Sequence, residues 1–193
     1  MPKQLLNKEG ALAPDMAIPK RRGDRGNITS TLRTFFVTSS VLGKRALLQS
    51  DRSAKLLIDI LYHYRSEHKY LLHEFVVMPD HLHVLITVGP ELSIERAVQF
   101  IKGGFAFRAG KEFGFKAPIW QRGFSELRVS NAQAAGRIRE YIVENPVVAR
   151  LVRSAREYGY SSAHPGFVLD QLPQGLKPVR VAAGNFGTSE DVP

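Results

Sequence analysis

The chain has 193 residues, of which 44% are hydrophobic and 23% are charged, and it contains no cysteine. This composition is typical of one globular domain, and the lack of cysteine excludes disulfides, zinc–thiolate sites and cysteine nucleophiles. The net charge of +9 favours a polyanionic partner such as nucleic acid, with a basic surface that has no such partner as the alternative.

Both ends of the chain differ from its middle. Residues 1–30 are rich in Gly, Pro and basic side chains and predict a flexible basic arm, either a plain tail or a phosphate contact through Arg21 and Arg22. Residues 164–193 predict a largely irregular tail. No apolar run is long enough for a membrane span or a signal peptide, so we expect a cytoplasmic protein, nucleoid-associated when bound to DNA, with no membrane partner.

The middle, residues 31–163, predicts a single domain. In chain order its apolar patterns indicate a strand over 34–38, a helix over 53–63, strands over 70–78 and 81–88, a helix that begins after Ser93, and a strand within 118–129. A further helix is expected over 131–145, where Pro146 ends or interrupts it, and another over 147–157.

The order β-α-β-β-α-β predicts an α+β fold of the ferredoxin-like kind. Such a chain forms a four-stranded antiparallel sheet with two helices on one face, here with an additional C-terminal helix. RNA-binding modules use the same plan, so the fold alone does not decide the function.

The sharpest local feature is the segment Met78–Ile86, which reads MPDHLHVLI. Side chains alternate along a strand, so His81 and His83 lie on one face while Leu82 and Val84 lie on the other. Two neutral imidazoles on one face can bind one metal ion, although two unconnected histidines are the commoner case for such a pair. We expect Asp80 to serve the turn before the strand and do not include it among the ligands.

Four motifs in order resemble one family: MPDHLHVLI, IKGGFAFR, WQRGF and YIVENPVVARLV. Together they are similar to the single-strand tyrosine transposases of bacterial insertion sequences, and most closely to the REP-associated tyrosine transposases, within the HUH endonucleases. The resemblance covers roughly residues 32–163. Ser125-Glu126-Leu127 and Val143-Glu144 depart from residues common in the family, which puts contacts to a particular DNA sequence in doubt.

The resemblance implies roles for four residues. His81 and His83 match the pair that binds a divalent metal, Mg²⁺ or Mn²⁺. Tyr141 matches the nucleophile that becomes joined to a 5′ phosphate, and Asn145 matches a further ligand to the metal. Positions 141 and 145 share one helix face, which fits joint action on one phosphate.

Each late residue also has a structural interpretation. Tyr141 can be a packing residue of an amphipathic helix. Asn145 precedes Pro146, and that pair is typical of the cap and first residue of a following helix.

Basic residues predict the DNA contacts. Besides Arg21 and Arg22, the candidates are Lys102, Arg108, Lys111, Arg122, Arg128 and Arg137. Aromatic neighbours can stack on unpaired bases; we expect Phe105 and Trp120 to be core residues instead.

The resemblance therefore predicts an enzyme that cuts and rejoins single-stranded, hairpin-forming DNA through a 5′-phosphotyrosine. The alternatives are a non-catalytic binder of single-stranded DNA or RNA on the same fold, a transposase relative that binds hairpins without cutting them, and a metal hydrolase. Relatives act as dimers or alone, so homodimer and monomer both stay open.

Overall fold

The structure is a computed structural model that describes residues 32–173. The predicted basic arm, with Arg21 and Arg22, lies outside the described residues, as does the tail from residue 174 onward. In the part of the chain that the structure describes, no helix is long and apolar enough to cross a membrane.

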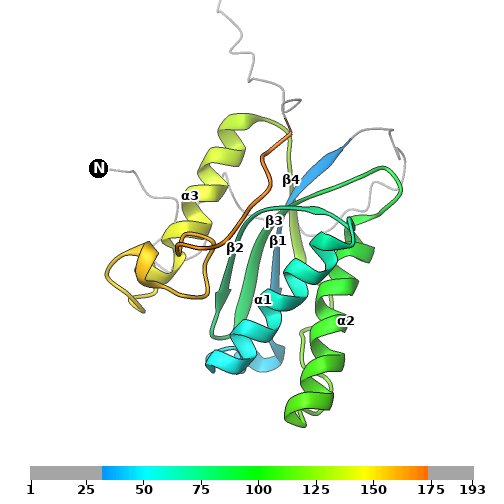
Figure 1. Ribbon diagram of the computed structural model, residues 1–193, viewed down its shortest axis with the longest axis vertical. Coiled ribbons are helices and arrows are strands. Elements are labelled where there is room, and N and C mark those ends of the chain that lie inside the picture. The colour runs from blue at the N-terminus through cyan, green and yellow to red at the C-terminus, as the bar shows by residue number, and fades with distance from the viewer. Residues whose placement is uncertain (1–31, 174–193) are drawn as a thin grey trace, which may run out of the picture.

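The elements follow the predicted order. The first strand and the first helix extend beyond the predicted ranges at both ends, whereas the second and third strands match theirs to within one residue. They are β1 (Arg33–Ser40), η2 (Leu42–Lys44), α1 (Asp51–Ser66), β2 (Leu71–Met78), β3 (His81–Val88), α2 (Ile94–Phe113), β4 (Ser125–Val129), α3 (Ala132–Val148) and η3 (Ala155–Glu157). The β-α-β-β-α-β plan with an additional helix is thus confirmed (Figure 1).

One antiparallel sheet runs in the order β2-β3-β1-β4. This is the strand order of the predicted ferredoxin-like fold, with β2 and β4 as the edges. Helices α1 and α2 pack on one face and α3 packs on the other. The sheet therefore has two buried sides that the same four strands supply with alternate residues.

The side under α1 and α2 holds the larger apolar core. Alternate residues of β3, including Leu82, Val84 and Ile86, point into it, as the sequence predicted. The Gly103-Gly104 pair does not interrupt α2. A Cβ at Gly104 would lie 3.0 Å from Cε2 of Tyr64, so glycine there lets α1 and α2 approach closely.

Helix α3 begins as predicted and ends later. The side chain of its N-cap, Asn131, accepts a hydrogen bond from the Ala134 amide. Pro146 lies inside the helix, buried in its last turn, so the predictions that it ends the helix and that residues 147–157 form another are wrong. Proline costs only one backbone hydrogen bond there, and the residue is buried.

The residues after η3 run along the exposed edge of β2. The Val77 amide donates to the Tyr160 carbonyl, and the Asp170 amide donates to the Leu72 carbonyl. The Leu72 amide donates in turn to the Asp170 carboxylate. Residues 164–173 have no helix or strand, yet the Arg65 guanidinium holds Asp170 with two hydrogen bonds. This segment covers backbone groups that an edge strand otherwise leaves open.

Candidate active site

The two histidines of β3 face each other on the α3 side of the sheet. Strand alternation puts both rings on this side, as predicted, and their Nε2 atoms lie 3.1 Å apart. His83 is buried, and His81 lies at the first residue of the strand with part of its ring exposed. The pair therefore presents two ring nitrogens toward one point at the end of the sheet.

The other nitrogen of each ring is held by a neighbour. Nδ1 of His81 lies 2.5 Å from Oδ1 of Asp80, and Nδ1 of His83 lies 2.8 Å from the Thr38 hydroxyl on β1. A carboxylate only accepts, so the His81 Nδ1 carries the hydrogen and Nε2 keeps its lone pair. Partners of this kind fix ring orientation in metal sites.

Burial keeps both imidazoles neutral. It lowers the pKa of His81, against an opposing effect of the Asp80 carboxylate, and it lowers the pKa of His83 well below 6.5. The nearby positive charge of Lys44, which pairs with Asp80, lowers both values further. Neutral imidazole is the form that binds a metal ion.

These features fit a divalent metal ion. Two nitrogens that each bind one ion at ~2.1 Å can be at most ~4.2 Å apart, and the two Nε2 atoms are well within that limit. Among residues 32–173, no group of three His, Cys, Asp or Glu side chains surrounds such a position. An ion held here would take its remaining ligands from an amide, water or substrate.

Helix α3 brings Tyr141 to the same point. Its hydroxyl lies 3.4 Å from Nε2 of His83, and its ring makes an edge contact with the His83 ring. Phe36, which is fully buried on β1, packs against the rings of His83 and Tyr141. Tyr141 is thus neither remote from the histidines nor a packing residue alone, since its hydroxyl is aimed at them.

Asn145 lies one turn further along the helix and reaches the same hydroxyl. Burial raises the pKa of Tyr141, and a side-chain hydrogen bond with Asn145 acts against that rise. Because Asn145 lies within α3, its interpretation as the cap of a following helix is wrong. The side-chain amide of Asn145 could supply a metal ligand in addition to the two histidine nitrogens.

Residues 36–145, more than half of the chain, match the family model described as IS200-like transposase. The chain belongs to the IS200-like transposase family. A solved structure of a REP-associated tyrosine transposase bound to a REP hairpin has the same fold, with a TM-score of 0.62 and 20% identity over 83% of this chain and 99% of that one. A candidate transposase of Deinococcus radiodurans is 26% identical, covers 64% of this chain and 97% of its own, and has a TM-score of 0.47. No curated protein matches.

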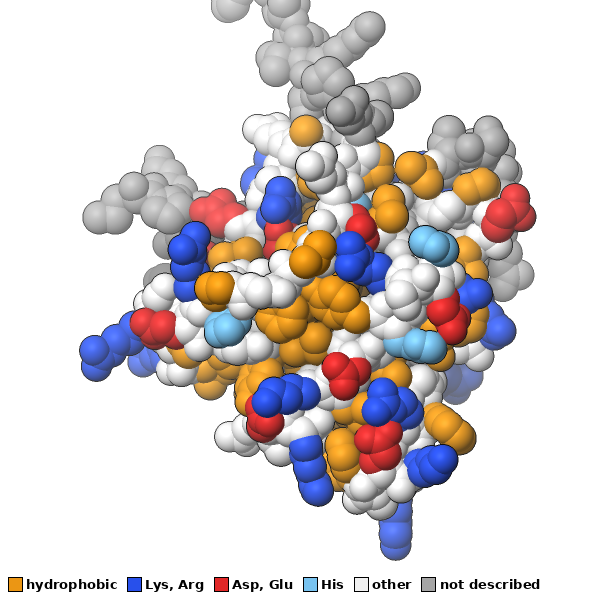
Figure 2. All heavy atoms as spheres, in the orientation of Figure 1, with side chains coloured by type: hydrophobic (Ala, Val, Ile, Leu, Met, Phe, Trp, Pro, Cys, Tyr) orange, Lys and Arg blue, Asp and Glu red, His pale blue; other side chains and the backbone are white. Residues whose placement is uncertain are grey.

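Among residues 32–173 of this IS200-like transposase, the basic residues predicted to contact DNA do not form one surface. Arg108 pairs with Glu112 on α2, on the side of the sheet away from the histidines, and Lys111 lies on the same helix. The Lys102 ammonium donates to the carbonyls of Gln121 and Gly123, so it holds the loop before β4. Figure 2 shows Lys and Arg interspersed with Asp and Glu on the face that carries α1.

The other candidates lie in three places. Arg137 is exposed on α3, four residues before Tyr141 and so on the same helix face. Arg122 precedes β4 at the end of the sheet where β3 begins, and Arg128 lies further along this edge strand, opposite Phe35. Phe105 and Trp120 are core residues, as expected.

Sequence reasoning missed the neighbours of the histidines. Asp80 contacts His81 as well as serving the turn, and its position beside the pair was a usable signal. Thr38 and Phe36 carried no such signal, since only the register of β1 against β3 brings them there. Contacts of this kind depend on pairing between strands distant in sequence.

Proposed function

We propose that this transposase cuts and rejoins single-stranded DNA through a covalent bond between Tyr141 and a 5′ phosphate. The observation that carries the proposal is the approach of the Tyr141 hydroxyl to within 3.4 Å of the His83 Nε2, beside the Nε2 of His81. A nucleophile and two neutral nitrogen ligands then address one phosphate. All three residues come from one chain, so the proposal needs no second subunit.

The reaction is a phosphoryl transfer to Tyr141 that cuts the strand, followed by a transfer away from Tyr141 that rejoins it. The Tyr141 oxygen attacks the phosphorus, the bond to the 3′ oxygen breaks, and the phenolic hydrogen ends on the released 3′ hydroxyl. The product is a phosphodiester, so a second 3′ hydroxyl can attack it and reseal the strand without a nucleotide cofactor. Burial raises the pKa of Tyr141, so the phenol is protonated at neutral pH and has to be activated when DNA binds.

His81, His83 and Asn145 would hold a divalent ion, Mg²⁺ or Mn²⁺. Such an ion, when bound, polarises the scissile phosphate and offsets the charge that develops on it. Asp80 and Thr38 would keep the two rings turned toward each other. Asn145 would also hold the Tyr141 hydroxyl in place through its hydrogen bond.

Hairpin-forming DNA is the substrate class that we propose. The structure with the same fold is described as bound to a REP hairpin, and the net charge of +9 suits a nucleic acid. Arg137 would lie nearest to the cleaved strand, since it shares the helix face of Tyr141.

One assay tests the nucleophile. The protein is incubated with labelled hairpin DNA and Mn²⁺, and adducts that survive SDS are separated on a gel. Tyr141→Phe is expected to abolish the adduct while leaving the affinity for DNA unchanged within about twofold, because one hydroxyl is lost and no charge changes.

Tyr160→Phe is the matched control. Its hydroxyl binds Asp51, away from the histidines, so this variant should form the adduct normally. A Tyr141→Phe protein that still forms adduct would refute the assigned nucleophile. Release of cut DNA without an adduct in the unmodified protein would favour a hydrolase, and binding without cutting would favour a non-catalytic hairpin binder.

A further inference from the structure

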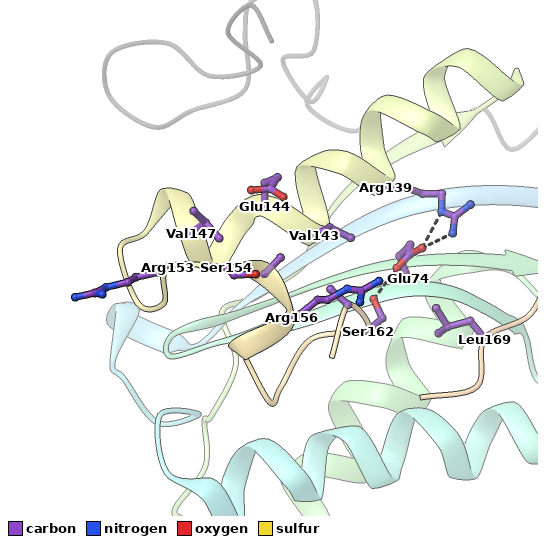
Figure 3. A pocket seen from close by; sticks show the side chains of 12 residues that line it. Glu74, Arg139, Val143, Glu144, Val147, Arg153, Ser154, Arg156, Ser162 and Leu169 are labelled. Atoms are coloured by element: carbon purple, nitrogen blue, oxygen red, sulfur yellow. Dashed lines mark hydrogen bonds and ion pairs between the residues drawn. The ribbon is translucent and has the colours of Figure 1, made fainter. Parts of the chain in front are cut away.

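A polar groove lies beside α3, on the flank away from Tyr141. Its volume is about 670 Å³, and α3, Glu74 of β2 and the segment from Arg153 to Leu169 enclose it (Figure 3). On α3 the lining residues Arg139, Val143 and Val147 recur every four positions, which is one face of a helix. That face is turned well away from Tyr141 at 100° per residue.

The floor of the groove is an ion pair between the buried Glu74 and the half-exposed Arg139. The Glu74 side chain is 5% exposed, and its Oε1 lies 2.7 Å from both Nε and an Nη atom of the Arg139 guanidinium. The other oxygen accepts from the Ser162 hydroxyl at 2.6 Å. The positive charge of Arg139 offsets the negative charge of Glu74. Arg139 has five N–H donors, and only part of them face Glu74.

Two further guanidinium groups have no ion-pair partner among residues 32–173. These are Arg153 and Arg156, both exposed beside η3. Figure 3 shows the Arg156 side chain directed along the groove toward Ser162 and Glu74, whereas Arg153 points outward. Glu144 is the remaining acid of the lining, exposed on α3. The groove therefore has more unpaired positive than negative charge.

We infer that this groove binds phosphates of the unpaired strand that flanks the cleavage site, an inference that rests on the proposed function. Guanidinium groups bind phosphate well because several N–H donors meet its oxygens. An α-helix with its side chains is about 10 Å across. An unpaired strand that crosses the outer surface of α3 therefore needs only a few nucleotides to reach from the phosphate at Tyr141 to Arg156.

DNA bound both at Tyr141 and in the groove would contact both flanks of α3, the helix that carries the nucleophile. Glu144 opposes the phosphates, so its carboxylate weakens binding. Substitutions of Arg156 and of Glu144 are therefore expected to change the affinity for DNA in opposite directions.

Binding of fluorescent hairpins in EDTA tests the inference without metal or cleavage. The probes share one ten-base-pair stem and carry either two or twelve unpaired thymidines, on the 5′ or on the 3′ side. With a twelve-nucleotide flank on one side, Arg156→Ala is expected to raise Kd roughly fivefold and to lower the slope of log Kd against log salt by about one. Glu144→Gln should lower Kd on the same probe about twofold.

Arg96→Ala is the matched control, since Arg96 is exposed on α2 across the sheet and the net charge changes equally. Equal Kd values for Arg156→Ala and Arg96→Ala on every probe would overturn the inference, and so would an equal loss with two-nucleotide flanks, which would assign Arg156 to the stem. Failure of the adduct assay with a positive result here would refute the nucleophile and leave the groove assignment standing.

Discussion

The two sides of the sheet are built from the same four strands and differ in what their buried residues do. Under α1 and α2 the strands present apolar side chains such as Leu82, Val84 and Ile86. Under α3 the intervening positions include His83 and Thr87, which are equally buried but polar. Every second residue of β3 thus belongs to an apolar layer, whereas the others belong to a layer that combines the apolar Leu85 with polar side chains.

The polar layer survives burial because its members bind one another. His73 joins the Asp170 carbonyl to the Thr87 hydroxyl, which in turn binds Thr34. Unpaired polar groups in such a place would cost about 1–3 kcal/mol each. The comparison teaches that one side of this sheet is packed mainly with apolar residues, whereas the other combines a smaller apolar cluster with polar side chains held in fixed orientations.

The sharpest test of this division compares neighbours on β3. His83→Ala removes a nitrogen that faces the proposed reaction centre and is expected to reduce adduct formation with hairpin DNA and Mn²⁺ by more than about 100-fold. Leu82→Ala removes a buried side chain from the other side and should lower the free energy of unfolding by about 2–5 kcal/mol.

Urea denaturation and the adduct assay, run on both variants, separate the two effects. The folded fraction of Leu82→Ala should form adduct at a normal rate. A Leu82→Ala protein that is stable but inactive, or a His83→Ala protein that is fully active, would contradict the division between the two sides.

A smaller effect is expected from the partner of His81. Asp80→Asn keeps the shape of the side chain but loses the charge that orients the ring, so the Mn²⁺ concentration for half-maximal adduct formation should rise about 10–100-fold. Asp59→Asn makes the same change at an exposed position of α1 and should leave that concentration unaltered. An unchanged metal requirement in Asp80→Asn would remove Asp80 from the site.

The smallest effect concerns pH. Burial lowers the pKa values of His73, His81 and His83, all of which lie on the α3 side. Below pH 6.5 the unfolded chain therefore binds protons that the folded chain does not, so stability falls as the pH decreases. In EDTA, the free energy of unfolding should decrease between pH 6.5 and 5, by at most about 1.4 kcal/mol per pH unit for each histidine.

His73→Gln should make this decrease less steep without changing the metal requirement of adduct formation. Denaturation curves at half-unit pH intervals provide the measurement. A free energy of unfolding that stays constant over this range would mean that these histidines are accessible to protons in the folded protein.

The residues of β3 were predictable because their pattern is local. Strand alternation has a period of two, so the sequence alone put His81 and His83 on one side and Leu82 and Val84 on the other. The motif resemblance selected Tyr141 and Asn145. It could not say how α3 crosses the sheet, because this depends on packing of Ile138 and Ile142 against strands far away in the sequence.

The errors have the same origin. Pro146 led to the prediction of a helix end, which is wrong. A local rule about proline cannot take account of its burial in the last turn of α3. The intramolecular partners of Lys102 were hidden for the same reason, since its ammonium donates to carbonyls of residues some 20 positions later. Charged residues can be counted from a sequence, but the groups that each of them contacts depend on the fold.

The sequence by itself determined the order of the strands and of the three main helices, the faces of the β3 residues and the family. Each depends on spacing along the chain, which short-range geometry controls. Only the tertiary structure decided that the Tyr141 hydroxyl meets the His83 ring, that Thr38 and Asp80 hold the two imidazoles, and that Arg139 and Arg156 line a groove behind the helix. Those meetings depend on strand register and helix packing, where the burial of many side chains together outweighs any local preference.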